Sequence, residues 1–484
     1  MRRYYFLLLG VSCFFLLAAT IDLDNLFQYA GQSVPTYISK DNTPPWNDIA
    51  DEGATLGRVL FYDKTLSLNS TIACASCHQQ EFAFSDTAVL SVGLAGGLTG
   101  RHAMRLVNAR FGDEVQFFWD ERATSLEDQS TRPIQDHVEM GFSGTNGDPA
   151  LDSLIRRMDA LPYYPRLFNE VYGDSMITEE RMQRALAQFI RSIQSFDSRY
   201  DVGRAQAINE GMPFLNFTQQ ENMGKALFIL PPGQGGAGCG GCHRPPEFDI
   251  VPNSGNNGVI SVAGDTSAID VNVTRAPSLR DLINPQGVLN GPLMHDGSFT
   301  SLMQVIEHYD SIPDNPMNTN LDQRLGGAGG PPGGPPPVLQ NLQLTDNEKL
   351  ALEAFLMTLT GTNIYTDEKW SNPFDSLGHL TILPMDTTST DTTGNDSTTT
   401  GIADRFEELD ILLYPNPASE IIQIEAASGR YQLSIFQMNG AMVMRKEVGG
   451  SEQLNLSQLP KGLLIFRFED LQKHTFFSQK IMHR

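Results

Sequence analysis

Two cysteines three residues apart, with a histidine directly after the second, occur twice in this chain. The motifs read C-A-S-C-H at residues 74–78 and C-G-G-C-H at residues 239–243. Chance predicts roughly 0.001 such motifs for this content of cysteine and histidine. Thiols with this spacing add to the two vinyl groups of a porphyrin, and the histidine becomes an axial ligand of the iron. The sequence therefore predicts two covalently bound haem c groups, held by Cys74, Cys77, His78, Cys239, Cys242 and His243.

Two other interpretations of a C-x-x-C pair are a redox dithiol and half of a zinc site. Neither explains why a histidine follows both pairs. The motifs also use every cysteine of the chain except Cys13. Haem c alone does not distinguish electron transfer from catalysis. What distinguishes them is whether one iron keeps an open face with acid–base groups over it.

The elements that must position these motifs begin with two helices. Apolar spacing predicts helices over residues 55–61 and 217–228, each ending in Leu-Phe shortly before a haem motif. In the second, Thr218 and Glu221 form a capping box. This weak internal repeat indicates two related haem-binding halves. Further helices are expected at residues 150–161, 178–196 and 345–358, and a loop or short helix broken by Pro133 at residues 126–138.

The length and net charge of the chain limit its number of domains and its classes of partner. The chain has 484 residues, enough for two or three domains with cores of their own. Its formal net charge of −23 argues against nucleic acid as a partner, because a polyanion would be repelled. The charge permits a basic protein partner such as a small cationic cytochrome, although an acidic balance is more simply explained by solubility.

The N-terminus has the pattern of a cleaved secretory signal over residues 1–20. Met1-Arg2-Arg3 is followed by an apolar run over residues 4–17 and then by small residues. The run is too short to predict a membrane span. Cys13 lies inside the run and is expected to leave with it, since Gly10 disfavours a lipoprotein signal. We therefore expect an exported protein, in keeping with haem c attachment outside the cytoplasm.

The last part of the chain differs in character. A Thr/Ser/Asp tract within residues 376–405 has nothing to bury and is predicted to be a disordered linker. Short alternating strands are expected after it, at residues 411–413, 421–424, 431–436, 441–448 and 463–468. They predict a small all-β sandwich over residues 406–484, at the C-terminus of a mainly α protein.

This C-terminal region resembles the sorting domain of the type IX secretion system of Bacteroidetes. The resemblance rests on Tyr414-Pro415-Asn416-Pro417, Asn439-Gly440 and the segment from Leu456 through Leu459-Pro460-Lys461-Gly462. It implies recognition by the type IX machinery and export across the outer membrane, with the domain usually removed. An ordinary carbohydrate-binding or adhesion sandwich is the alternative.

Between the haem motifs, a second resemblance appears. Trp119, Gln129 and Glu139 are spaced ten residues apart. In this spacing, the chain resembles the bacterial dihaem cytochrome c peroxidases and the related dihaem enzyme that matures tryptophan tryptophylquinone. The likeness runs from about residue 44 to 361. It includes the segments L-G-R-V-L-F at 56–61, R-A-P-S-L-R at 275–280 and M-H-D-G-S at 294–298.

The resemblance implies roles for these three residues. Cleavage of a peroxide O–O bond needs a group that takes a proton from the near oxygen and returns it to the departing one. Glu139 is expected to do this over an open iron, with Gln129 orienting peroxide or water. Trp119 is expected to provide an oxidisable ring between the two metals.

The family also suggests sixth ligands for the irons. In peroxidases that require prior reduction, the first iron carries a second histidine, where this chain has Leu94, so that iron is expected to be open. His102 stands where the family more often has an asparagine that helps to bind calcium, which leaves calcium open; His102 is a displaced distal ligand or, more simply, a packing residue. At the second iron, alignment places Tyr309 as the sixth ligand. Its alternatives are Met303, Met294 and His308.

Together these features predict two cytochrome-c-like haem domains, a peroxidatic one over residues 21–205 and an electron-transferring one over residues 206–375. The expected activity is reduction of hydrogen peroxide, with electrons from a small cytochrome or cupredoxin. The alternatives are a protein-modifying dihaem oxidase, which Leu94 and Tyr309 favour, and a non-catalytic electron-transfer cytochrome. The expected location is the periplasm or, through the sorting domain, the cell surface or exterior. A homodimer is left open.

Overall fold

The computed structural model describes residues 20–326 and 338–383, and, of the last part of the chain, residues 411–414, 421–426, 430–437, 442–449, 452–470 and 476–483. The predicted signal peptide (apart from Thr20) and the part of the predicted linker from residue 384 to 405 lie outside these ranges. The chain divides into two compact units, Met1–Thr388 and Ser389–Arg484. In the described part of the chain, no helix has the length and apolar character needed to cross a membrane.

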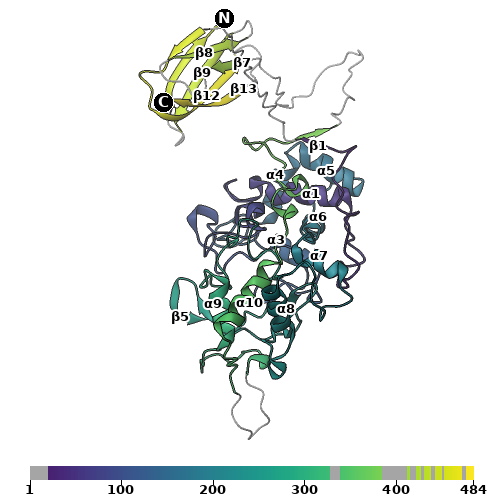
Figure 1. Ribbon diagram of the computed structural model, residues 1–484. Helices are drawn as coiled ribbons and strands as arrows, with labels where there is room; N and C mark the ends of the chain where they lie inside the picture. The colour runs from purple at the N-terminus through teal and green to yellow at the C-terminus, as the bar shows by residue number, and fades with distance from the viewer. Residues whose placement is uncertain are drawn as a thin grey trace, which may run out of the picture. The chain divides into compact units, whose positions relative to one another are not determined.

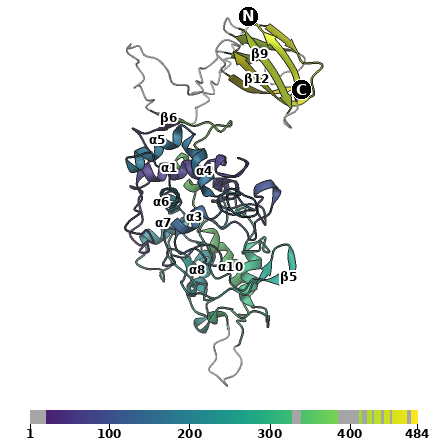
Figure 2. The ribbon, with the colours of Figure 1, turned by 180° about the vertical axis from the view of Figure 1, so that it is seen from behind.

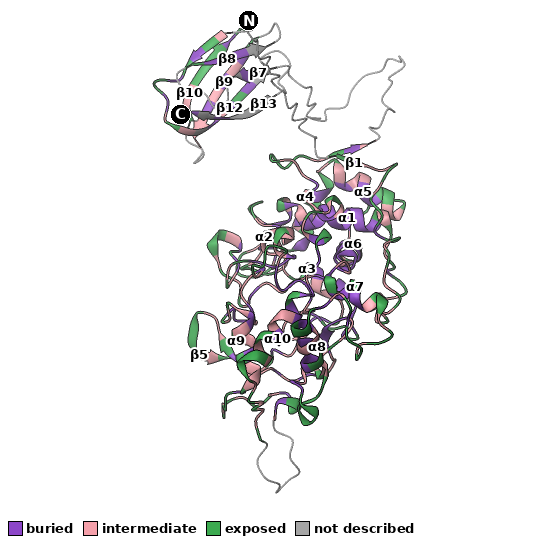
Figure 3. Ribbon diagram, viewed as in Figure 1, coloured by how far each residue is buried: buried purple, intermediate pink, exposed green. Residues whose placement is uncertain are grey.

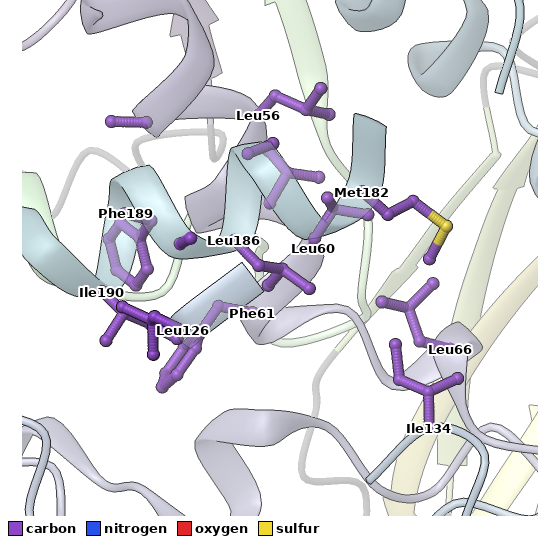
Figure 4. Close-up of a cluster of buried hydrophobic side chains, with 14 of the residues drawn as sticks. Leu56, Leu60, Phe61, Leu66, Leu126, Ile134, Met182, Leu186, Phe189 and Ile190 are labelled. Atoms are coloured by element: carbon purple, nitrogen blue, oxygen red, sulfur yellow. The ribbon is translucent and has the colours of Figure 1, made fainter. Parts of the chain in front are cut away.

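The first apolar core of the larger unit is built on two helices, α1 (Asp51–Tyr62) and α6 (Glu179–Ser192). Leucine and phenylalanine side chains of both helices gather between them (Figure 4). The helices approach closely because Gly57 has no side chain: a Cβ there would lie 2.0 Å from the carbonyl oxygen of Ala185. Thr178 caps the N-terminus of α6, since its side chain accepts a hydrogen bond from the Arg181 backbone N–H.

The second apolar core repeats this arrangement with α8 (Gln219–Ile229) and α10 (Asp346–Met357). Here a Cβ on Gly224 would lie 1.8 Å from the carbonyl oxygen of Ala351. In both pairs the glycine precedes the Leu-Phe sequence by three residues, and the haem motif follows. The internal repeat expected from the sequence therefore has a physical basis in the way each motif's helix packs on its partner.

Views from two sides place α1, α4, α5 and α6 together at one end of this unit and α8 and α10 together at the other (Figures 1 and 2). Buried residues concentrate along these helices, and exposed ones along the connecting loops (Figure 3). The remaining helices are α2 (Cys74–Cys77), α3 (Leu126–Thr131), α4 (Leu151–Asp159), α5 (Tyr163–Tyr172), α7 (Arg199–Gln206) and α9 (Leu302–Asp310). Two short hairpins accompany them: β2 (His243–Arg244) with β3 (Asp249–Ile250), and β4 (Ser261–Val262) with β5 (Asp265–Ile269).

The helices α5 and α7 are not predicted by the sequence analysis. In α5, Pro165 obscures the helical pattern, but it occupies the first turn, where a missing N–H costs no hydrogen bond. The N-terminus of α7 is a capping box between Ser198 and Asp201. Conversely, α3 ends before Pro133, as expected, and α6 ends at Ser192, four residues before the predicted end.

After the second core, the chain returns to the first. Trp370 is buried in the first core, and the guanidinium of Arg58 donates to the carbonyl oxygen of Ser371 at 2.6 Å. The strand β6 (Thr381–Leu383) then pairs in parallel with β1 (Thr20–Asp22). Residues 381–383, which fall inside the predicted linker, are thus an ordered strand, because β1 supplies the backbone partners that β6 needs.

The C-terminal unit contains two antiparallel sheets in the residues described. One has the order β10-β9-β12-β13 and the other β11-β8-β7. Their inward side chains form one shared core, which includes Ile422, Leu433 and Phe466. Fully buried and more exposed residues alternate along β9, as they do in a sandwich that buries one face of each sheet.

The strands of the sandwich are β7 (Ile411–Tyr414), β8 (Ile421–Ala426), β9 (Tyr431–Gln437), β10 (Met442–Val448), β11 (Glu452–Asn455), β12 (Gly462–Asp470) and β13 (Phe476–His483). Five of them coincide with predicted strands, whereas β11 and β13 are additional. The fold class predicted from the sequence, mainly helical with a small C-terminal β-sandwich, is confirmed.

Candidate active site

A small cavity of about 60 Å³ joins the first haem motif to two of the predicted catalytic residues. Cys74, Cys77 and His78 line it, together with Gln129 and Glu139. These five side chains come from α2, from α3 and from the loops after them. The donor set suits a haem c, but the void is smaller than a porphyrin, so its lining has to open around one.

His78 is oriented by its backbone surroundings. Its Nδ1 lies 3.1 Å from the carbonyl oxygen of Phe84, which leaves Nε2 free to ligate iron. The backbone at Phe84 is left-handed (φ 57°), which turns this carbonyl toward the ring. Burial lowers the pKa of His78, so the imidazole is held in the neutral form that binds metal.

The cysteine thiols are not activated. Burial raises the pKa of Cys74 to about 12 and that of Cys77 to about 11. It raises the pKa of Cys239 and Cys242 to about 12 and about 11 in the same way. Redox dithiols depend instead on a lowered thiol pKa. These values disfavour the dithiol interpretation and are compatible with thiols that are consumed by thioether formation.

Glu139 has the environment of a proton-transfer group. Burial, aided by the nearby charge of Asp136, raises the pKa of Glu139 to about 7. Within the described chain, no group donates a hydrogen bond to its carboxylate. Its backbone is fixed by Asp136, whose Oδ1 accepts from the N–H groups of Val138 and Glu139 at 2.8 and 3.0 Å. A rigid backbone thus carries an unpaired carboxyl group into the cavity.

Gln129 is positioned by α3, which is fastened to α6. Arg191 on α6 makes a buried, two-pronged ion pair with Glu127 on α3, at 2.6 and 3.1 Å. Ser125 caps α3 by accepting from the Asp128 N–H. Among the described residues, the amide group of Gln129 has no hydrogen-bond partner, which leaves it available to a small polar molecule in the cavity.

The loop that could supply a distal histidine packs directly on the Glu139 segment. The backbone N–H of Leu94 donates to the carbonyl oxygens of Val138 and Glu139, at 2.7 and 3.1 Å. A Cβ on Gly93 would lie 2.3 Å from the Val138 oxygen, so only glycine permits this approach. In the described lining of the small cavity, His78 is the sole imidazole. The buried thioether of Met140 also lines it, a feature that the sequence analysis did not anticipate.

A second and larger cavity, of about 580 Å³, surrounds the other haem motif. Cys239, Cys242 and His243 line it, and its size falls in the range of cofactor sites. Burial lowers the pKa of His243 to about 4. The Nδ1 of His243 is buried, and no hydrogen bond to it forms in the described structure, although the Phe248 carbonyl is close enough to influence its pKa.

Two of the four candidate sixth ligands of the second iron line the larger cavity. Tyr309 and Met294 line it, whereas His308 and Met303 do not. Burial raises the pKa of Tyr309, and Asn257 hydrogen-bonds its phenol. Asn257 also donates to the sulfur of Met294 at 3.2 Å. The sixth ligand stays a prediction, with Tyr309 and Met294 both in position to compete for it.

Trp119 and His102 belong to the lining of the larger cavity. The indole N–H of Trp119 donates to the carbonyl oxygen of His102 at 2.8 Å, and its ring meets His295 edge-on at 6.2 Å. The Nδ1 of His102 lies 3.0 Å from the carbonyl oxygen of Ala88. The structure thus places the His102 ring away from the small cavity, against backbone carbonyls, as a packing residue would be.

The stretch of chain after His102 connects the two sites. His102 to Arg105 line the larger cavity, whereas Leu106 lines the smaller one. The backbone of Met104 is close enough to the His78 ring to raise its pKa against the effect of burial. Trp119 donates a hydrogen bond to the His102 carbonyl oxygen. It therefore lies beside the stretch of backbone that connects the two sites.

Two arginines of the larger cavity, Arg105 and Arg275, have no role in the sequence analysis. The signal that could have found Arg275 is its place at the start of the R-A-P-S-L-R segment. Calcium remains a prediction: in the described part of the chain, no three acidic, histidine or cysteine side chains converge in a way that could hold a metal ion.

Comparison with known proteins gives matches to both units. A family model described as di-haem cytochrome c peroxidase matches residues 51–207. A model described as a secretion system C-terminal sorting domain matches residues 412–483. The first unit is similar over most of its length to the proteins described next.

The chain is 30% identical over 328 residues to the methylamine utilization protein MauG of Methylophilus methylotrophus, covering 66% of this chain and 85% of that protein. It is 28% identical over 314 residues to the cytochrome c551 peroxidase of Nitrosomonas europaea, covering 61% and 84%. The solved structure of a MauG-like protein associated with microbial copper homeostasis superimposes with a TM-score of 0.55 at 29% identity, covering 70% of this chain and 98% of that one.

Proposed function

The chain belongs to the di-haem cytochrome c peroxidase and MauG family, and from this premise we propose that it reduces hydrogen peroxide to water. The family implies two haem c groups and peroxide as a substrate. The observation that carries the proposal is the convergence of the unpaired Glu139 and Gln129 side chains in the cavity of the first haem motif. Its relatives include both peroxidases and MauG proteins, so the choice of peroxidase rests on this site.

Haem bound at His78 would supply the redox chemistry that cleaves the O–O bond. Glu139 takes the proton from the oxygen of peroxide nearer the iron and returns it to the departing oxygen, which leaves as water. The pKa of about 7 suits both steps, since the group is close to equally able to accept and donate a proton at neutral pH. Gln129 holds the peroxide through its amide group, and the apolar lining excludes bulk water.

The electrons enter through the second site. A haem held by Cys239, Cys242 and His243 would accept them from a small cytochrome or cupredoxin. Trp119 lines that cavity and is hydrogen-bonded to the stretch that leads toward His78, which supports its role as the relay between the sites. The sorting domain implies a secretion machinery, and we propose that this is the type IX system, which takes the protein to the cell surface.

The substitution Glu139→Gln tests the acid–base role. It keeps the size of the side chain and removes its titratable group, so we expect peroxide turnover to fall by about 10²- to 10⁴-fold with both haem absorbance spectra unchanged. Glu170→Gln, which neutralises an exposed glutamate on α5, is the matched control and should retain full turnover. Full turnover by Glu139→Gln would refute the assignment.

A protein-modifying oxidase is the second candidate, favoured by Leu94 in place of a distal histidine and by Tyr309 in the larger cavity. Rapid mixing of the fully ferric protein with peroxide, before and after one-electron reduction, separates the candidates. Immediate reaction of the ferric form favours the oxidase. Reaction of only the half-reduced form favours a peroxidase that needs prior reduction, in which a side chain of the small cavity, such as Met140, would first have to make room for peroxide. Silence in both states would instead indicate an electron carrier.

A further inference from the structure

Three buried guanidinium nitrogens of residues that line the larger cavity have no hydrogen-bond partner in the described structure. They are the Nε of Arg105 and the Nε and Nη1 of Arg275, and both residues line the cavity. A buried guanidinium group whose donors lack acceptors is destabilising, even where a carboxylate is nearby. Such donors therefore indicate that the site is completed by an anionic group.

The surroundings of Arg275 leave part of its guanidinium group without hydrogen-bond acceptors. Only 4% of this residue is exposed, and its guanidinium lies over the ring of Phe117 at 4.7 Å. Its nearest carboxylate is that of Asp249, at 3.9 Å, which is too long for a hydrogen bond. Burial raises the pKa of Asp249 to about 6, so its carboxylate is a counter-charge near neutral pH, but it does not reach the Nε or Nη1 of Arg275 as a hydrogen-bond acceptor. Arg275 is held in place by its backbone N–H, which donates to the carbonyl oxygen of Trp119.

Arg105 also has an unpaired hydrogen-bond donor. Its Nη2 donates to the carbonyl oxygen of Ser278 at 3.2 Å, while its Nε has no acceptor in the described structure. Burial lowers the pKa of Arg105 to about 10, which still leaves it protonated at neutral pH. Ser278 lies three residues after Arg275. Arg275 therefore belongs to the short segment to which Arg105 donates its hydrogen bond.

Arg324, a third arginine that lines the same cavity, has both a close counter-charge and hydrogen-bond acceptors. It makes an ion pair with Asp322 and donates to the carbonyl oxygen of Gly241, inside the haem motif. Arg324 is therefore neutralised and lies at the cysteine edge of the cavity. Thioether bonds to Cys239 and Cys242 would hold one edge of a porphyrin. The two propionate carboxylates of a porphyrin extend from the opposite edge.

We propose that Arg105 and Arg275 bind the two propionate carboxylates of the haem attached at Cys239 and Cys242. Guanidinium groups suit this task because their forked donors match a carboxylate. The inference rests on haem attachment at the second motif, as part of the proposed function, and not on the reaction at the first site. Arg105 belongs to the stretch of chain that reaches the small cavity at Leu106, and the backbone N–H of Arg275 donates to the carbonyl oxygen of Trp119, so both arginines are connected to the region between the two sites.

Redox potential is the property that reports these contacts. A cation beside the haem stabilises the reduced state, which carries one more negative charge, so losing it lowers the midpoint potential. Haem content is not informative here, because the thioether bonds keep the porphyrin on the chain. Spectroelectrochemical titration of the full, haem-bearing protein resolves the potential of each haem without any turnover.

The test compares Arg105→Gln, Arg275→Gln and Arg275→Lys with Arg204→Gln, an arginine that is paired with Glu210 outside the cavity. Both glutamine variants at the cavity should lower the potential of the second haem, and Arg275→Lys, which keeps the charge, should lower it less. Arg204→Gln should leave it unchanged. If Arg275→Gln fails to accumulate, Arg105→Gln and Arg275→Lys decide.

The proposal is overturned if Arg105→Gln has no more effect on the potential of the second haem than Arg204→Gln has. It is also overturned if Arg275→Lys and Arg275→Gln have equal effects, because a purely structural residue would not distinguish the two replacements by charge. Glu139→Gln affects turnover and not this potential. A failure of the propionate assignment is therefore distinguishable from a failure of the peroxidase assignment.

Discussion

Glu139 and Tyr309 show how burial sets the chemistry of a single residue in this molecule. Both have a raised pKa, and in both the largest cause is desolvation. For Glu139 the result is a carboxyl group that exchanges a proton near neutral pH. For Tyr309 the result is a protonated phenol, which must lose its proton before it can ligate iron as tyrosinate. The two sites therefore respond differently to pH.

At Glu139 we expect a pH-dependent rate. The carboxylate is the form that accepts a proton from peroxide, so turnover should fall as the pH drops through about 7, the pKa of this group. Asp136→Asn removes a neighbouring like charge while keeping the Oδ1 acceptor that fixes the backbone. It should lower the pKa of Glu139 and move this limb of the profile to lower pH. A pH profile of kcat/KM measures both; an identical limb in Asp136→Asn and the unmodified protein would contradict the assignment.

At Tyr309 the expectation concerns potential. Tyrosinate is a hard donor that stabilises ferric iron, so Tyr309→Phe should raise the midpoint potential of the second haem and change its charge-transfer absorbance. Met294→Leu is the control for the competing ligand in the same cavity. If Met294→Leu shifts the potential and Tyr309→Phe does not, methionine is the sixth ligand.

At the scale of elements, the two helix pairs explain how one architecture serves two haem motifs. The α1–α6 and α8–α10 pairs each bring a glycine against a backbone carbonyl, at Gly57 and Gly224. This close approach fixes the end of the helix that leads into each motif. The loop around Leu94 uses the same device at Gly93, where it supports the backbone of Glu139.

Adding a methyl group at these helix contacts should destabilise the fold. A Cβ at Gly57 or Gly224 would overlap a carbonyl oxygen, and the helices would have to separate, so we expect each alanine variant to lose about 1–3 kcal/mol of unfolding free energy. Gly31→Ala, where nothing lies within 4 Å of the new Cβ, is the control. Urea unfolding followed by circular dichroism measures the difference; losses no larger than that of Gly31→Ala would show that the helix spacing adapts.

At the scale of the whole molecule, the helical unit and the sandwich have separate apolar cores. The first unit has two apolar cores, and its chain returns from the second core to the first at Trp370 and β6. The sandwich has a separate core of its own. No residue of the candidate active site belongs to the sandwich, as expected for a sorting signal.

A chain that ends at Thr388 should therefore keep both haems and its peroxide turnover but lose export to the cell surface. Expression in a host with a type IX system, followed by fractionation and haem staining, measures this. A chain that ends at Thr360 is not an equivalent variant, because it would also lack Trp370, which packs in the first core. Recovery of the Thr388-terminated protein at the cell surface would contradict the role of the sandwich.

Much of this protein could be predicted from sequence because its chemistry is covalent and local. The haem motifs, the caps at Thr178, Thr218 and Thr345, and the alternation of the C-terminal strands all depend on neighbours within a few residues. The sequence could not predict β6, whose strand partner β1 lies at the other end of the first unit's sequence. Nor could it reveal α5, where a proline in the first turn hides the helix.

The amino-acid sequence by itself predicted two haem c groups, the residues that would attach them, and the spaced residues that accompany them. The tertiary structure decided which of those residues share a cavity. It placed Glu139 and Gln129 with the first motif, moved His102 to the larger cavity and left Arg105 and Arg275 with unpaired donors there. Burial, proximity and missing partners are properties of residues distant in sequence, and only the folded chain brings those residues together.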